Sequence, residues 1–126
     1  MKSIMPKFSL LCVMLFFAFT AAMAQNSPDI NKEPALKTYL IERDIPGAGT
    51  FTPLELKGIS QKSCTVIKEI GPQIVWLHSY VAGNKIYCVY KAENEELLRT
   101  HAKKGGFPIT TITEINTTIS PATAEK

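Results

Sequence analysis

The stretch from Val75 to Tyr90 constrains the fold most, because it holds two strand-like runs joined by a two-residue turn. Gly83 and Asn84 tolerate the positive φ angles that a tight hairpin turn requires. This turn fixes the register of the hairpin, since Ala82 must then pair with Lys85. Side chains alternate across a strand, so the register also decides which side chains share a face.

The predicted register divides the hairpin into an aliphatic face and an aromatic face. The aliphatic face carries Leu77, Ser79, Val81, Ile86, Cys88 and Tyr90. The aromatic face carries Trp76, His78, Tyr80, Tyr87 and Val89. We expect the aliphatic face to meet helices and the aromatic face to stay uncovered by them.

Four further elements flank the hairpin. Residues 35–46 and 110–119 are rich in β-branched and aromatic residues and predict a first and a last strand. Residues 52–72 and 92–108 have the apolar spacing and the terminal residues of helices. The order is β-α-β-β-α-β, which in a chain this short is the split βαβ, or ferredoxin-like, pattern of an α+β protein.

The ends of both helices are marked by capping residues. Thr52 with Glu55 forms the sequence of a capping box, and Asn94 is suited to begin the second helix. Gly71 stands where the first helix should end, and Gly105 and Gly106 stand where the second should end. We therefore expect a four-stranded antiparallel sheet with two helices on one face. The open face would be solvated, bound to a ligand, or paired with a second subunit in a dimeric α+β barrel.

Residues 1–24 have the three parts of a secretory signal peptide. Lys2 and Lys7 precede an apolar run from Phe8 to Phe19, and Ala22-Met23-Ala24 is a small-x-small cleavage pattern. The apolar run is shorter than the roughly 20 residues of a membrane span. We expect a secreted or periplasmic protein with no membrane span after cleavage.

The predicted mature chain has the size of one small domain. Cleavage after residue 24 removes two lysines, which leaves 102 of the 126 residues and lowers the formal net charge from +3 to +1. A charge this balanced does not indicate nucleic acid as a partner. We expect a flexible lead-in over residues 25–35, a ferredoxin-like domain over 36–120 and a tail over 121–126.

Two cysteines, Cys64 and Cys88, remain after cleavage. An even pair in an exported protein allows a disulfide. In the split βαβ arrangement the first helix crosses above the hairpin, so Cys64 on that helix can approach Cys88. The alternative is two buried free thiols, because cysteine packs well as a small apolar residue.

Two carboxylates and a histidine are the first candidate metal ligands. Glu42 and Asp44 lie on the opposite side of the first strand from Tyr39 and Ile41. If the latter pack under the helices, the carboxylates share the open face with His78. Imidazole with carboxylate suits a divalent transition metal. The alternative is a charged strand edge beside an interface histidine.

The second histidine of the chain, His101, falls one turn after Leu97 on the second predicted helix. It is a second candidate ligand, and an ordinary packed histidine between helix and sheet is the alternative. In this arrangement His78 and His101 lie on opposite sides of the sheet. Sheet and helix layers are about 10 Å apart, so one ion could not easily bind both histidines within a subunit.

Several motifs together resemble a small family of nickel-binding proteins first catalogued as a domain of unknown function. They are YLIERDIPG at residues 39–47, the run over residues 70–108 with WLHSYV, YCVY and HA followed by GFP, and ITEI at residues 112–115. The resemblance implies a ferredoxin-like fold, a homodimer built through the sheets, and nickel bound with histidine ligands. The matching positions are His78, His101, and Glu42 and Asp44 of the ERD motif. The signal peptide departs from the usual cytosolic pattern of that family.

Three functions are open from the sequence. The leading one is an exported homodimer, not an enzyme, that binds nickel or a similar divalent ion near His78. The second is a cofactor-independent oxygenase or haem-handling enzyme, with Trp76, His78, Tyr80 and Tyr87 lining a pocket between subunits. The third is a module whose open face binds another envelope protein. The sequence contains no nucleophile elbow, P-loop or dinucleotide-binding fingerprint.

Overall fold

A computed structural model describes residues 32–125 of the chain. Its elements, in chain order, are β1 (Lys37–Asp44), η1 (Ala48–Thr50), α1 (Pro53–Ile70), β2 (Ile74–Ala82), β3 (Lys85–Ala92), α2 (Glu95–Gly105), β4 (Thr111–Glu114) and η2 (Pro121–Glu125), where η denotes a 3-10 helix. The predicted signal peptide and most of the predicted lead-in lie outside the described residues.

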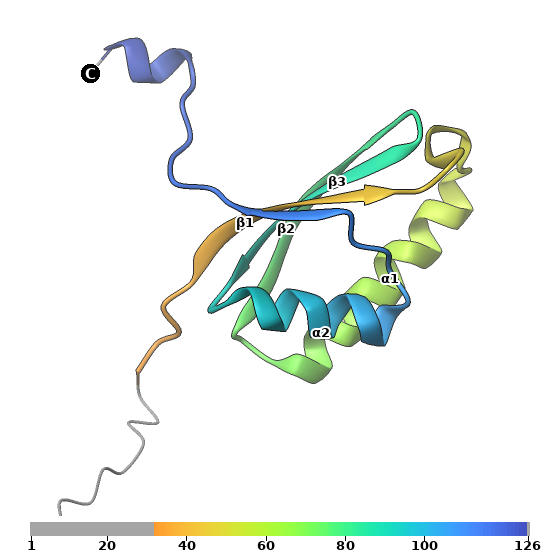
Figure 1. Cartoon of the computed structure of the whole chain (residues 1–126), viewed down its shortest axis with the longest axis horizontal. Helices are drawn as coiled ribbons and strands as arrows, with labels where there is room; N and C mark the ends of the chain where they lie inside the picture. The colour runs from red at the N-terminus through yellow and green to blue at the C-terminus, as the bar shows by residue number, and fades with distance from the viewer. Residues whose placement is uncertain (1–31, 126) are drawn as a thin grey trace, which may run out of the picture. The chain divides into compact units, whose positions relative to one another are not determined.

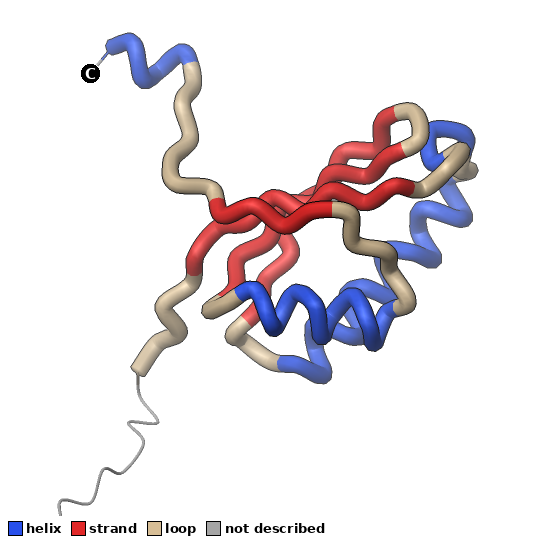
Figure 2. Tube along the Cα trace, in the orientation of Figure 1, coloured by secondary structure: helices blue, strands red, loops and turns tan. Residues whose placement is uncertain are grey.

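The four strands form one antiparallel sheet in the order β2-β3-β1-β4. Both α-helices lie on the same side of this sheet, and the opposite side is bare (Figures 1 and 2). The predicted α+β, ferredoxin-like fold is therefore confirmed. Among residues 32–125, no helix has the length and apolar content that crossing a membrane would require.

The last strand is shorter than its β-branched sequence predicted. β4 pairs with β1 from Thr111 opposite Glu42 to Glu114 opposite Tyr39. The amide of Ile115 makes one more hydrogen bond, to the carbonyl oxygen of Thr38. β1 begins at residue 37, so the residues that follow have no strand to pair with, whatever their propensity.

The predicted capping residues begin and end both helices. Thr52 Oγ1 accepts the backbone N–H of Glu55 at 3.3 Å, and the Glu55 carboxylate accepts the N–H of Thr52 at 2.7 Å. Asn94 Oδ1 accepts the N–H of Leu97 at 3.1 Å at the start of α2. Gly106 follows α2 with a left-handed φ of 70°, which favours glycine.

The register of the hairpin is as predicted from Ala82 opposite Lys85 back to His78 opposite Val89, and it changes beyond that point. A β-bulge places Trp76, not Leu77, opposite Tyr90. One extra residue in a strand moves the side chains on its far side to the opposite face of the sheet, and here that residue is Leu77. The prediction that Trp76 lies on the open face is therefore wrong.

Trp76 belongs to the helix side of the sheet. Its ring is stacked on that of Tyr90, with 6.5 Å between the centroids. Its indole N–H donates to Ser79 Oγ at 2.9 Å, and Ser79 faces the helices. The bulged residue, Leu77, keeps 44% of its surface exposed.

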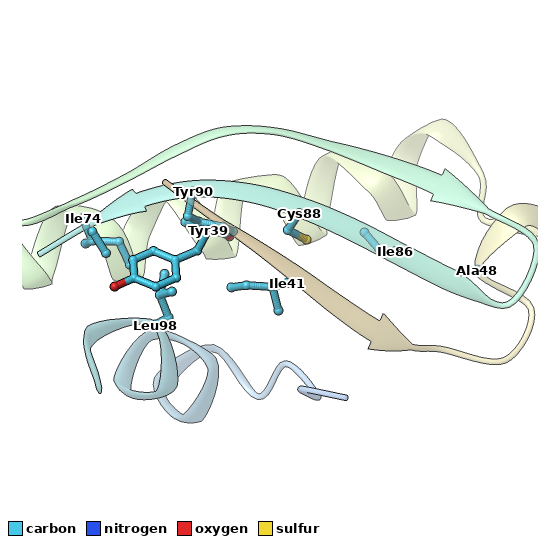
Figure 3. Close-up of a cluster of buried hydrophobic side chains, with 9 residues drawn as sticks. Tyr39, Ile41, Ala48, Ile74, Ile86, Cys88, Tyr90 and Leu98 are labelled. Carbon is cyan, nitrogen blue, oxygen red and sulfur yellow. The ribbon is translucent and has the colours of Figure 1, made fainter. Parts of the chain in front are cut away.

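The hydrophobic core fills the space between the sheet and the helices. Alternate residues of β1 and β3 supply its floor, and Leu98 of α2 lies against them with no exposed surface. Figure 3 shows Leu98 pointing at the side chains of Tyr39 and Ile41. Because Tyr39 and Ile41 are buried on this side, their neighbours Leu40 and Glu42 must face the other side.

Candidate functional site

The open face of the sheet presents aromatic and apolar side chains, as the hairpin register predicted. Tyr80 is 62% exposed, and its ring lies edge-on to His78 with 5.1 Å between the centroids. Tyr87 stands opposite Tyr80 on β3, and Val89 stands opposite His78. His78 is exposed on the edge strand, so its imidazole is accessible to a ligand or a second subunit.

The two carboxylates on the open face are engaged by a lysine. Lys85 Nζ donates to the Glu42 carboxylate and lies 3.3 Å from Asp44 Oδ1. The hydrogen bonds to Glu42, and secondarily to Asp44, raise the pKa of Lys85. The lysine therefore stays charged and offsets part of the negative charge of the pair.

The structure does not bring Glu42 and Asp44 to His78. β3 lies between β1 and β2, so these strands are about 10 Å apart at a spacing of about 4.8 Å per strand. Along the strands, His78 lies in the row of Val89 and Leu40, while Glu42 lies in the row of Tyr87. Within residues 32–125, no three His, Cys, Asp or Glu side chains gather closely enough to hold a metal ion.

His101 is packed on the helix side of the sheet, away from His78. It has no exposed surface and lies between the rings of Tyr90 and Phe107, at centroid distances of 5.2 and 5.4 Å. Burial, and secondarily the positive charge of Arg43, lowers the pKa of His101 to about 4. At neutral pH it is an uncharged core residue and is not accessible to an ion from solvent.

His101 is part of a buried polar cluster formed by Arg43, Ser63, Tyr90 and His101. Ser63 Oγ joins two of its members, at 3.1 Å from His101 Nε2 and 3.2 Å from Tyr90 Oη. Burial raises the pKa of Tyr90, so its phenol stays protonated. Arg43 is then the only charged member of this cluster at neutral pH.

Of the two alternatives for Cys64 and Cys88, a disulfide or two free thiols, the structure has the free thiols. Both are free thiols, and Cys88 is buried while Cys64 is exposed. The rotation of α1 explains the difference, because Ser63 and Val66 are the side chains that it buries. Cys64 therefore points away from the sheet in which Cys88 lies.

A hollow of about 400 Å³ lies between α1 and the sheet and opens beside the edge strand β2. Two small residues of α1, Ser60 and Ser63, line it where larger side chains would fill the space. Arg43 and Trp76 line it from the sheet. We call this the α1–β2 cavity. Any pocket expected from the sequence was on the opposite, open face.

Arg43 was not among the residues singled out from the sequence, although a signal for it was present. It alternates with Tyr39 and Ile41 along β1, and all three are buried on the helix side. A charged residue in phase with core residues is predicted to be buried with them. A buried charge is unusual enough to indicate a role.

Comparisons with known proteins identify the family of this chain and a solved structure with the same fold. The model of one protein family, described as "Nickel responsive protein SCO4226-like", matches residues 39–115. The chain belongs to this family. The match extends from β1 to the residue after β4, so the SCO4226-like region contains both His78 and His101. A search of curated protein sequences finds no match.

The solved structure of SCO4226 from Streptomyces coelicolor A3(2) has the same fold. The two structures superpose with a TM-score of 0.55, over 65% of this chain and 99% of that chain, and their sequences are 17% identical. At this identity the likeness establishes the fold alone. Because the match covers 99% of the solved chain, nearly all of that chain has the fold described above.

Proposed function

We propose that this SCO4226-like protein binds nickel, or a similar divalent transition metal, through His78 on the open face of its sheet. The single observation that supports this most directly is the exposed imidazole of His78 beside Tyr80, in a chain of a nickel-responsive family. Imidazole is a preferred ligand of nickel. His101, by contrast, is fully buried in the core.

One chain does not supply a complete set of metal ligands within residues 32–125. His78 would hold one position, and the others must come from water or from a second copy. In a two-fold dimer built through the open faces, each face meets the same face of its partner. We therefore propose a homodimer in which His78 of each subunit lies near the interface.

The composition of the open face supports such a dimer. Tyr80 and Val75 are exposed, and Leu40, Tyr87 and Val89 are only half-buried. Tyrosine is enriched in interfaces between subunits, where its apolar ring and its hydroxyl group both find partners. Pairing the open faces would cover these side chains and the ion pairs of Lys85.

We propose further that the protein acts outside the cytoplasm. The leader of residues 1–24 supports export, with cleavage after Ala24. An exported nickel-binding protein would take up the ion in the envelope or beyond it. Glu42 and Asp44 are not proposed as direct ligands of the ion at His78, because β3 lies between their strand and β2 and both pair with Lys85.

Isothermal titration of the tag-free protein with nickel chloride tests the role of His78. The His78→Ala variant is expected to bind nickel at least about tenfold more weakly. Even residues that only orient a metal ligand contribute about 10- to 100-fold to affinity. His101→Gln is the matched control, because it removes the other imidazole of the chain from a buried position.

The control separates the two histidines. His101→Gln is expected to keep nickel affinity within about twofold of the wild type, since His101 is not accessible to the ion. Equal affinity of the wild type and His78→Ala would contradict the proposed ligand. A polyhistidine tag must be absent, because it would itself bind nickel.

A further inference from the structure

The α1–β2 cavity lies mainly on the helix side of the sheet, and along β2 its lining also includes His78. Its walls are mostly apolar, with Ile59 from α1, Val81 from β2 and Ile86 from β3. Its volume of about 400 Å³ lies in the range of about 300 to 1,000 Å³ that is common for small-molecule sites. An apolar hollow of this size with a few polar groups is the usual form of a ligand pocket.

Arg43 is the charged group of this cavity. Only 3% of its surface is exposed, and it lines the hollow. Its Nη1 donates to the carbonyl oxygen of Pro108 at 2.7 Å, and its guanidinium carbon lies 5.5 Å from the centre of the Phe107 ring. Its Nη2 is buried without a hydrogen-bond partner.

No carboxylate within residues 32–125 forms an ion pair with Arg43. Tyr90 and His101, which belong to the same buried cluster, are uncharged at neutral pH, since burial raises the pKa of the phenol and lowers the pKa of the imidazole to about 4. A buried charge without a counter-charge costs several kcal/mol, and a buried N–H without an acceptor adds to that cost. An anion that enters the cavity would offset both.

The single cation and the apolar walls of the cavity favour a carboxylate over a phosphate. A guanidinium group binds carboxylates and phosphates well. A phosphate at neutral pH carries up to two charges, and the cavity has one cation and apolar walls that cannot solvate a second charge. A carboxylate carries one charge, and an apolar chain attached to it would lie along Ile59 and Ile86.

We propose that the α1–β2 cavity binds a small amphipathic carboxylate, with its head at the guanidinium group of Arg43 and its apolar part between α1 and the sheet. Ser60 and Ser63 line the same hollow, and their hydroxyl groups are already hydrogen-bonded within the protein, Ser60 to the carbonyl oxygen of Leu56 and Ser63 to Tyr90 and His101. Leu77 and Val81, both partly exposed on the edge strand, mark the mouth through which such a molecule would enter. The argument for this site rests on Arg43 and not on the nickel site proposed above, although His78 also lines the hollow.

Trp76 provides a direct readout of this cavity. It is the only tryptophan of the chain, and its ring lines the hollow. Intrinsic fluorescence of the tag-free protein can therefore be followed while octanoate is added, with EDTA present to exclude metal effects. Octanamide, of nearly the same shape but uncharged, is the matched ligand, and inorganic phosphate tests an anion without an apolar part.

The wild type is expected to bind octanoate about tenfold or more tightly than octanamide, because hydrogen bonds to charged groups contribute more than neutral ones. Phosphate should not compete. Arg43→Met should erase the preference for the charged ligand, and Ser60→Leu should weaken both ligands by filling the hollow. Tyr80→Ala, which changes the open face but not the lining of the cavity, should bind octanoate as the wild type does.

Equal binding of octanoate and octanamide by the wild type would overturn the proposal, and so would the absence of any binding. In either case Arg43 serves only to join β1 to Phe107 and Pro108. The comparison of the two ligands on the wild type decides the matter even if Arg43→Met does not fold. Lys85→Met, which removes a cation from the opposite face, should leave the preference for octanoate unchanged.

Discussion

Leu98→Ala is expected to lower the free energy of unfolding by roughly 3 kcal/mol. Leu98 has no exposed surface and packs against Tyr39 and Ile41 across the helix–sheet interface. Its truncation removes apolar contacts and leaves a cavity that the surrounding residues fill only in part. A loss of this size is a large share of the roughly 5 to 15 kcal/mol by which small domains are stable. Urea unfolding followed by circular dichroism measures it.

Leu54→Ala is the matched control for this prediction. Leu54 lies in the first turn of α1 and is 79% exposed. The same chemical change there is expected to alter stability by no more than about 0.5 kcal/mol. If the two variants lost the same stability, α2 would not pack on the sheet as described.

The second large effect is a loss of stability in mild acid that depends on His101. The pKa of His101 is lowered from 6.5 to about 4 by burial, and secondarily by the charge of Arg43. Between these values the unfolded chain binds a proton that the folded protein does not bind. The contribution of neutral His101 is therefore fully present above pH 6.5 and decreases as the pH falls towards 4.

The size of the acid effect follows from the same linkage. Between pH 7 and pH 5 the free energy of unfolding is expected to fall by up to about 2 kcal/mol on account of His101 alone. His101→Gln removes the titrating group, so its stability should fall by correspondingly less over this interval. Unfolding curves of both proteins at pH 7, 6 and 5 measure the difference. Parallel pH profiles would show that His101 titrates as it does in the unfolded chain.

Most of the fold could be predicted because local signals agreed with one another. The Gly83-Asn84 turn determined the register of the hairpin, and capping residues marked the helix ends close to where they occur. Two features could not be read in this way. The β-bulge that turns Trp76 to the helix side has no marker such as glycine at that position. The length of β4 depends on where β1 begins, which is a tertiary constraint.

The candidate site was only partly predictable, for a related reason. Alternation along β1 and β2 correctly assigned His78 and Glu42 to the open face, but it carries no information about distances across the sheet. The third strand between β1 and β2 separates these residues. The ion pairs of Lys85 with Glu42 and Asp44 arise from pairing between strands that are far apart in the sequence.

The orientation of α1 about its own axis determines which of its side chains face the sheet and which face solvent. It turns Cys64 outward, so a disulfide with Cys88 does not form, and it turns Ser63 inward to join Tyr90 and His101. The small serine side chains on this inner side leave room for the α1–β2 cavity beside Arg43. The helix side therefore contains a buried polar cluster, of which the sequence had indicated a packed His101 as one alternative.

Nickel binding by a homodimer is the central proposal for this protein. The decisive measurement combines elemental analysis with light scattering on the tag-free protein, after incubation with nickel chloride and dialysis, with the mass of the processed chain taken from mass spectrometry. We predict that nickel stays bound to a particle of twice the mass of the chain, and that His78→Ala loses the nickel. A monomer that retains no nickel would contradict the account.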